Sequence, residues 1–184
     1  IHQRARQSVA APQSREHRII IAAVVNLKGI PAHVKFILTD KLLEITPGRK
    51  IVVAKNVSTP EEYLADHFPG FPVMPGVLML EALVQAGGWL IRHSEDFKHS
   101  AILLKEVRAI RYNNFVAPGN TLKLDLTVRK QDGQLWDFNG SGTVNGNSAV
   151  SARLSLEALN LSDRNPELAS SDAARRDTYR NLFQ

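Results

Sequence analysis

The stretch from Val77 to Ile91 constrains the fold most, because it is apolar on nearly every side of a helix. Its sequence is VLMLEALVQAGGWLI, and Glu81 is its only charged residue. A helix that is apolar all round belongs inside a core, since other elements must cover each side of it. It is shorter than the roughly 20 apolar residues that span a bilayer, and Glu81 interrupts it. The sequence therefore predicts a long buried helix, not a membrane span.

The densest cluster of proline and glycine in the chain precedes this helix, as HFPGFPVMPG at residues 67–76. Each proline biases the residue before it toward extended geometry, so residues 67–74 are predicted to form a rigid, non-helical loop. Pro75 suits the first turn of a helix, because the N–H that it lacks would have no helical partner there. The helix is expected to run from there to about Arg92.

Period-two alternation predicts strands on both sides of the helix. For example, the leucines at 122, 124 and 126 alternate with polar residues, as in a strand with one buried face. Turn dipeptides delimit extended segments at 101–116, 120–130, 134–144 and 148–159, which we expect to pair consecutively and antiparallel. Residues 36–45 and 50–57 flank a Pro-Gly turn and predict a hairpin. The predicted fold is α+β, with one long helix against a sheet of about five or six strands.

Composition and charge exclude several classes of protein. The chain has 184 residues, 43% of them hydrophobic, and no cysteine, so disulfides and thiolate metal sites are excluded. Its net charge of +5 raises the question of a polyanionic partner. However, residues 1–18 carry four arginines against one glutamate, and only a slight basic excess remains on residues 19–159. Because no nucleic-acid motif accompanies this excess, we expect no nucleic-acid partner.

The two ends of the chain are expected to lie outside the domain at residues 30–159. Residues 1–18 lack hydrophobic periodicity and a signal-peptide cleavage pattern, so we interpret residues 1–29 as an N-terminal arm of a cytoplasmic protein. The arm is rich in Arg and Ser, and an organelle-targeting segment is the alternative. Residues 160–184 form a C-terminal tail, either as a loosely docked helix that starts near Asn165-Pro166 or as a disordered segment.

His67 and Glu81 stand in unusual places for surface residues. A carboxylate among apolar helix residues is desolvated, which raises its pKa and keeps it a proton donor near neutral pH. Histidine is the usual proton acceptor at that pH. The helix start between them offers free N–H groups to an oxyanion, the first at Gly76. This set suits removal of a C–H proton beside a carbonyl and loss of a β-hydroxyl. The alternative is that both residues make only structural hydrogen bonds.

Residues 67–86, HFPGFPVMPGVLMLEALVQA, closely resemble the active-site signature of the (3R)-3-hydroxyacyl-[acyl-carrier-protein] dehydratases of the FabZ/FabA type. FILTDKLLEITPGRKIVVAKNV at 36–57 resembles the opening hairpin of this family, and the likeness covers about residues 30–158. The resemblance implies the hot-dog fold, in which a curved antiparallel sheet wraps a central helix. It also implies homodimers, some assembled as trimers of dimers, with His67 of one subunit facing Glu81 of the other.

The resemblance also implies a mechanism on a 3-hydroxyacyl thioester of acyl carrier protein. His67 would take the C2 proton and Glu81 would protonate or position the leaving hydroxyl, which leaves a trans-2-enoyl thioester. The N–H groups of Gly76 and Val77 would hold the thioester carbonyl. Gln85, one turn past Glu81, could orient the carboxylate or bond to neighbouring backbone instead. No cofactor is implied, and the sequence shows no set of metal ligands.

Two larger sets of residues are candidates for substrate binding. An apolar tunnel for the acyl chain would draw on Phe68, Phe71, Val73, Met74, Leu78 and Tyr112, although core packing explains at least half of them better. An acidic carrier protein could dock on Lys105, Arg108, Arg111, Arg129 and Lys130, and a solvated strand surface is the alternative explanation for these residues.

Two departures from the family pattern bear on substrate range. Asp66 stands where the family usually has Gly, and Ala32-His33-Val34-Lys35-Phe36 replaces a His-Arg-Tyr-Pro-Phe segment. The competing functions are another hot-dog thioester enzyme, namely a thioesterase, an enoyl-CoA hydratase or a dehydratase that also isomerises, and a catalytically silent homologue that binds acyl carrier protein. The isomerising relatives typically carry Asp at the position of Glu81.

Overall fold

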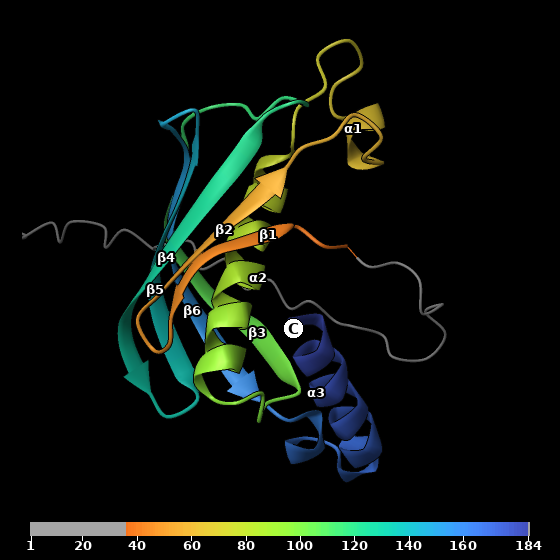
Figure 1. Cartoon of the computed structure of the whole chain (residues 1–184), viewed down its shortest axis with the longest axis vertical. Helices are drawn as coiled ribbons and strands as arrows, with labels where there is room; N and C mark the ends of the chain where they lie inside the picture. The colour runs from red at the N-terminus through yellow and green to blue at the C-terminus, as the bar shows by residue number, and fades with distance from the viewer. Residues whose placement is uncertain (1–35, 184) are drawn as a thin grey trace, which may run out of the picture.

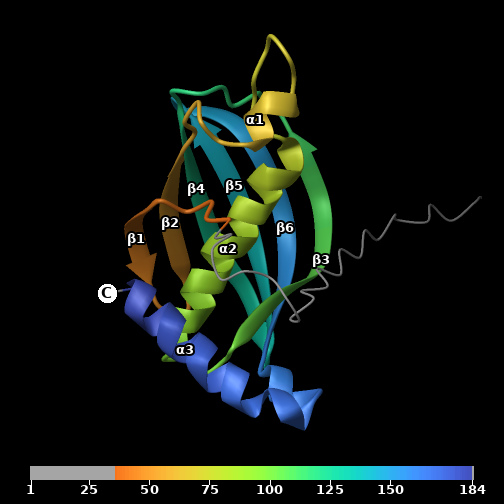
Figure 2. The same ribbon diagram turned by 90° about the vertical axis from the view of Figure 1, so that its right-hand side faces the viewer.

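The computed structural model describes residues 36–183, and the arm expected at residues 1–29 lies outside them. A six-stranded antiparallel sheet curves around the long helix α2 (Gly76–Ser94), as Figures 1 and 2 show from two sides. The strands are β1 (Lys41–Thr46), β2 (Lys50–Asn56), β3 (Ala101–Tyr112), β4 (Thr121–Asp132), β5 (Leu135–Val144) and β6 (Asn147–Leu159). The remaining helices are α1 (Tyr63–Asp66), η1 (Leu161–Asp163), η2 (Pro166–Leu168) and α3 (Ala169–Phe183). The predicted α+β hot-dog architecture is confirmed.

Helix α2 begins where the proline pattern predicts. Pro75 is extended, with φ −56° and ψ 139°, and its carbonyl accepts the N–H groups of residues 78 and 79. The helix packs against the sheet through small residues as well as large ones. An added Cβ at Gly87 would lie 2.7 Å from Cδ1 of Leu156 on β6, whereas one at Gly88 would meet only the Nη1 end of Arg92, at 2.9 Å. Contact between helix and sheet is therefore closest at Gly87.

The order of strands in the sheet is β1-β2-β4-β5-β6-β3, which corrects the expectation that the last four strands pair consecutively. Strands β4, β5 and β6 do pair in that way, but β3 pairs with β6 and forms an edge. Residues 113–120 form a crossing loop instead of a tight turn. The Met74 N–H donates to the carbonyl of Val116, and Val57 exchanges backbone bonds with residues 119 and 120. These bonds hold the loop at the end of β2, which places β4 beside β2.

Two strands are shorter than the alternation predicts. Strand β1 starts at Lys41 and not at residue 36, because the preceding backbone bonds to a side chain of α2. The Phe36 carbonyl accepts a hydrogen bond from Gln85 Nε2, and the Leu38 N–H donates to Gln85 Oε1. At the other side of the sheet, β3 ends at Tyr112, where the crossing loop begins. In each case backbone groups find partners outside the strand ladder.

The residues after β6 form the docked helix, one of the two alternatives for the C-terminal tail, and Figure 2 shows α3 crossing the lower part of α2. Asp172 of α3 is buried. Burial would raise its pKa, but hydrogen bonds from Ser100 and from η1 outweigh that effect and lower the pKa to about 2. Farther along α3, the Tyr179 ring centroid lies 3.8 Å from Cζ of Arg92 on α2. A buried anchor and a stacked cation therefore fix α3 to the body.

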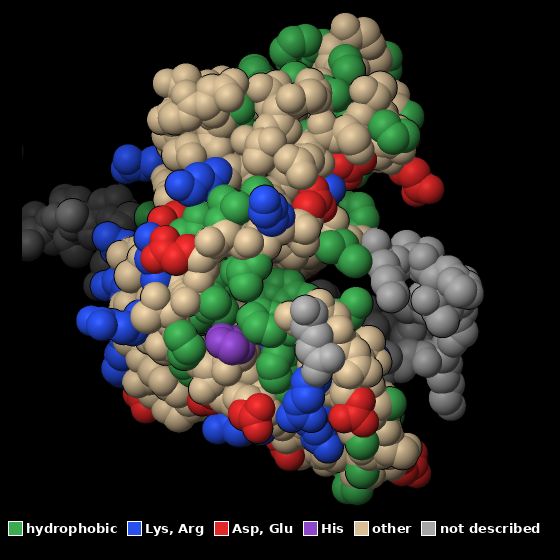
Figure 3. All heavy atoms as spheres, viewed as in Figure 1, with side chains coloured by type: hydrophobic (Ala, Val, Ile, Leu, Met, Phe, Trp, Pro, Cys, Tyr) green, Lys and Arg blue, Asp and Glu red, His purple; other side chains and the backbone are tan. Residues whose placement is uncertain are grey.

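Apolar side chains remain exposed on β1 and on the segment before it, namely Phe36, Ile37, Leu42 and Leu43. Figure 3 shows apolar side chains along the middle of this face, with several Lys and Arg side chains toward the sheet side. Within residues 36–183, no helix combines the length and the hydropathy that a bilayer crossing requires.

Candidate active site

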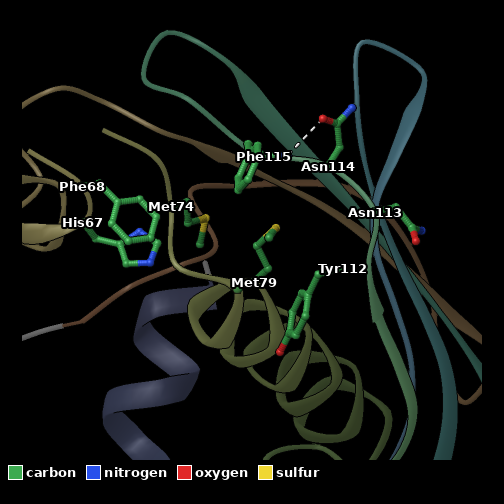
Figure 4. Close-up of a pocket in the computed structure, with 9 residues that line it drawn as sticks. His67, Phe68, Met74, Met79, Tyr112, Asn113, Asn114 and Phe115 are labelled. Carbon is green, nitrogen blue, oxygen red and sulfur yellow. Dashed lines mark hydrogen bonds between the residues drawn. The ribbon is translucent and has the colours of Figure 1, made fainter. Parts of the chain in front are cut away.

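A cavity of about 350 Å³ lies between the proline-rich loop, the start of α2 and the end of β3 (Figure 4). The residues that line it are His67, Phe68, Met74, Gly76, Met79, Tyr112, Asn113, Asn114 and Phe115. The cavity thus brings together the candidate base His67, the candidate oxyanion donor Gly76 and three of the six tunnel candidates. Those three are Phe68, Met74 and Tyr112.

His67 is held in one orientation by its own loop. Its Nδ1 lies 2.9 Å from the carbonyl oxygen of Val73, and the Val73 N–H donates back to the carbonyl of His67. A carbonyl can only accept, so the proton of the neutral imidazole belongs on Nδ1 and the lone pair on Nε2. The imidazole also stacks on the Phe68 ring, with centroids 4.2 Å apart. The half-buried ring therefore has Nε2 as its proton-accepting atom.

The start of α2 supplies hydrogen-bond donors beside this imidazole. The N–H groups of residues 78 and 79 bond to the Pro75 carbonyl, but those of Gly76 and Val77 have no backbone partner within residues 36–183. A Cβ at position 76 would lie 3.0 Å from Cε1 of Tyr112, so glycine lets the tyrosine ring pack against the helix start. The positive end of the helix and two N–H groups without partners make this a suitable place for an oxyanion.

Glu81 lies farther along α2 and bonds to Gln85. Burial raises the pKa of the Glu81 carboxyl, and the hydrogen bond from Gln85 lowers it by less. Gln85 Nε2 lies 3.0 Å from Glu81 Oε1 and 3.0 Å from the Phe36 carbonyl, while Gln85 Oε1 accepts the Leu38 N–H at 2.9 Å. The two backbone partners fix which end of the amide is the donor, so Glu81 faces an N–H. Gln85 makes both contacts considered from the sequence, one to the carboxylate and one to backbone.

The cavity does not contain every residue that the sequence singled out. Glu81 is absent from the lining of the cavity in its own chain, and so are the tunnel candidates Phe71, Val73 and Leu78. Val73 is fully buried, whereas Phe71 is exposed and packs edge-on against Phe115 with centroids 5.7 Å apart. Their tunnel roles stay predictions.

Sequence reasoning missed four lining residues, namely Met79, Asn113, Asn114 and Phe115. Met79 had a usable signal, because it lies three residues after Gly76 and so on the same side of the helix. The other three belong to the crossing loop, whose path depends on hydrogen bonds that no local pattern shows. In Figure 4 the Asn114 side chain accepts the N–H of Phe115.

The five docking candidates divide between two places on the sheet. Lys105, Arg108 and Arg111 lie on the edge strand β3, whereas Arg129 and Lys130 lie near the end of β4, and β5 and β6 stand between. All five are exposed. Three of them are paired with carboxylates: Lys105 with Glu157 at 3.2 Å, Arg108 with Glu106 at 2.7 Å and Lys130 with Asp132 at 3.0 Å.

The acidic residue next to His67 in the sequence, Asp66, does not build a metal site with it. Asp66, the departure from the family pattern, is exposed at the end of α1. In the part of the chain that the structure describes, no three His, Asp or Glu side chains gather in a way that could hold a metal ion.

Comparison with known proteins agrees with this geometry. Residues 30–153 match the model of the FabA-like domain. The chain belongs to the FabA-like family. The FabA-like match ends within β6, so α3 lies outside it.

Two relatives of this FabA-like chain are named 3-hydroxyacyl-[acyl-carrier-protein] dehydratase FabZ. The one from Clostridium acetobutylicum is 39% identical over 127 residues, which cover 69% of this chain and 90% of the relative. The one from Myxococcus xanthus is 41% identical over 128 residues, which cover 68% of this chain and 82% of the relative. A solved structure, the dehydratase heterocomplex ApeI:P of Xenorhabdus doucetiae, has a TM-score of 0.58 at 18% identity and covers 72% of this chain and 90% of that one. The last likeness shows the fold.

Proposed function

We propose that this FabA-like protein dehydrates (3R)-3-hydroxyacyl-[acyl-carrier-protein] to the trans-2-enoyl thioester, as a hydro-lyase of fatty acid biosynthesis. The observation that carries the proposal is the cavity that both the oriented His67 and Gly76, at the start of α2, line. A base beside an oxyanion site is what proton abstraction next to a thioester carbonyl requires. The FabZ names of the relatives support the same reaction.

In the first step, Nε2 of His67 removes the proton from C2 of the substrate. The Nδ1–H of His67 continues to donate to the carbonyl of Val73, and this hydrogen bond stabilises the imidazolium that forms. Negative charge develops on the thioester oxygen. The N–H groups of Gly76 and Val77 donate to this oxygen, and the positive end of the α2 dipole adds to the stabilisation.

In the second step, Glu81 gives its proton to the hydroxyl on C3. The C3–O bond breaks, water leaves, and the electron pair from C2 forms the double bond. Burial raises the pKa of Glu81, so the carboxyl retains a proton to give near neutral pH. The proton that His67 gained then returns to Glu81, which closes the cycle. The side chains of His67 and Glu81 carry out each proton transfer, the N–H groups stabilise the oxyanion, and the proposal includes no cofactor.

The proposal further pairs His67 of one subunit with Glu81 of another in a homodimer. Support comes from Glu81, which lies outside the cavity of its own chain. It also comes from a ring of large apolar side chains around the cavity that stay 47–65% exposed in one chain. They are Phe68, Phe71, Val77, Tyr112 and Phe115. An exposed apolar patch of this kind is typical of a contact surface, and a second copy could cover it while it contributes Glu81.

The partner in this proposal is an acyl carrier protein, and the location is the cytoplasm. Basic residues on β3 and β4 are the proposed contacts for the acidic carrier, with the reactive end of its thioester at the His67 cavity. Because β5 and β6 separate the two basic groups, the carrier would contact one group at a time.

The test is to incubate the protein with 3-hydroxyacyl and trans-2-enoyl carrier-protein thioesters and follow the enoyl absorbance. We expect interconversion by the unaltered protein and a loss of about 10²- to 10⁴-fold in His67→Ala and in Glu81→Gln. The matched controls, His93→Gln and Glu44→Gln, should keep their activity. If no interconversion occurs, the protein would be a silent homologue. Release of free thiol would indicate a thioesterase, and a product with a shifted double bond would indicate a dehydratase that also isomerises. Each of these results contradicts the proposal.

A further inference from the structure

A second cavity, of about 310 Å³, lies on the other face of the sheet from α2. Its lining comes from three neighbouring strands: Ala109 and Arg111 of β3, Asn139 and Gly140 of β5, and Ser151, Ala152 and Arg153 of β6. Side chains alternate between the two faces of a strand. On β5, Phe138 points into the core, so Asn139 points outward, and on β6 the buried Leu154 sets Arg153 outward in the same way.

The cavity forms where β3 departs from regular pairing. The register of β3 against β6 shifts between Arg108 and Arg111, which leaves Ala109 and Ile110 without paired residues. Arg111 pairs with Ser151, and Arg153 lies two residues farther along the same neighbouring strand. Diagonal neighbours of this kind are about 7–8 Å apart, within reach of two long side chains. Both arginines therefore line one hollow.

The charge in this cavity is unbalanced. The lining contains two arginines, an asparagine and a serine, and no acidic residue. Within residues 36–183, no hydrogen bond or ion pair is present for either guanidinium group, in contrast to the paired Lys105 and Lys130. The carboxylate of Asp137, on the same strand as Asn139, accepts the hydroxyl of Ser155 instead. Two arginines at one hollow whose lining has no acidic residue favour an anionic ligand.

We propose that this cavity is a binding site for a phosphate group, held by Arg111 and Arg153, with Asn139 and Ser151 as neutral donors. The guanidinium fork matches two phosphate oxygens, and a tetrahedral anion has oxygens left for the amide and the hydroxyl. A hollow lined by three strands suits a compact group better than the flat side of a protein helix. The site is separate from the His67 cavity, because Tyr112 lines that cavity while the adjacent Arg111 points to the opposite face.

The test is a titration of the full-length protein at low ionic strength, followed by calorimetry and by amide NMR shifts. Inorganic phosphate and adenosine 3′,5′-bisphosphate serve as two probes that distinguish a free phosphate from a phosphate monoester. We expect binding by at least one probe, with the largest shifts at residues 139 and 151. Arg111→Gln and Arg153→Gln should each weaken it about tenfold or more. The matched control is Arg49→Gln, an exposed arginine in the turn between β1 and β2.

Several results would overturn the proposal. One is no binding of either probe up to about 10 mM, which corresponds to a negligible affinity. Another is equal weakening in Arg49→Gln, which would show non-specific attraction to the basic surface. A third is that the two variants weaken only the binding of an acidic carrier protein, which would assign these arginines to protein docking. Thermal melts of each variant would confirm folding, and the dehydratase assay would be run separately, because Arg111 is also a proposed contact of the carrier protein and a change in that activity would not by itself test the phosphate site.

Discussion

Mixing two inactive variants tests whether one active site needs two chains. His67→Ala lacks the base, and Glu81→Gln lacks the proton donor, so neither variant alone has a complete site. In a mixed dimer, one site combines both substitutions and the other combines the intact His67 with the intact Glu81. Activity should therefore return on mixing if the two residues act across an interface, and only then.

The size of the recovery follows from counting sites. When equal amounts of the two variants exchange freely, about half of the dimers are mixed, and each of these has one intact site of two. The mixture should then reach about a quarter of the unaltered activity per chain. A site built within one chain would give no recovery, because every chain carries a substitution in its own site.

The assay is the enoyl absorbance after the variants are unfolded and refolded together. Native mass spectrometry of chains with different mass tags would measure the fraction of mixed dimers directly. The control mixes His67→Ala with the double variant His67→Ala/Glu81→Gln, in which every site of every dimer lacks the base. Abundant mixed dimers without recovered activity would refute the composite site, and recovery in the control mixture would show contamination.

Three further outcomes follow from the structure. Gln85→Leu removes a hydrogen bond that lowers the pKa of Glu81, so the pKa of this proton donor should rise. In the pH profile of kcat/KM, the limb where activity falls with rising pH should therefore move to higher pH, and a shift of this limb to lower pH would contradict the reasoning. Gly87→Ala should lower stability in urea unfolding by about 1 kcal/mol, since the overlap with a β6 leucine costs about 1–3 kcal/mol and helix propensity returns about 1, which leaves a net cost of about 0–2. Gly88→Ala, whose added Cβ displaces the end of the Arg92 side chain and no backbone or sheet leucine, should lower it less. Asp172→Asn should cost about 1–3 kcal/mol at pH 7 by weakening the anchor of α3. Because the folded pKa of Asp172 is below the usual 3.8, this difference should shrink as the pH falls through 3.8 toward about 2.

Local patterns predicted the elements that local physics decides. The proline-rich loop and the start of α2 lie where the sequence indicates, since Pro75 restricts its own backbone and removes a donor. The position of β3 was predicted wrongly, because alternation identifies a strand but not its neighbour. That choice depends on hydrogen bonds between the crossing loop and residues distant in sequence, such as the one between Met74 and Val116. The late start of β1 has the same origin in the side chain of Gln85.

In the candidate site, too, the sequence suggests residues but does not place them. His67 and Glu81 are identifiable from the sequence, yet the helix itself keeps Glu81 from the cavity that contains Gly76. At 3.6 residues per turn, positions 76 and 81 differ by about 140° around α2, whereas Met79 is only about 60° from Gly76. Met79 therefore lines the cavity and Glu81 faces away from it. This rotation is set by the helix and not by a rotamer, so if Glu81 is the proton donor at this cavity, a second chain has to supply it, and recovery in the mixing experiment is the expected result.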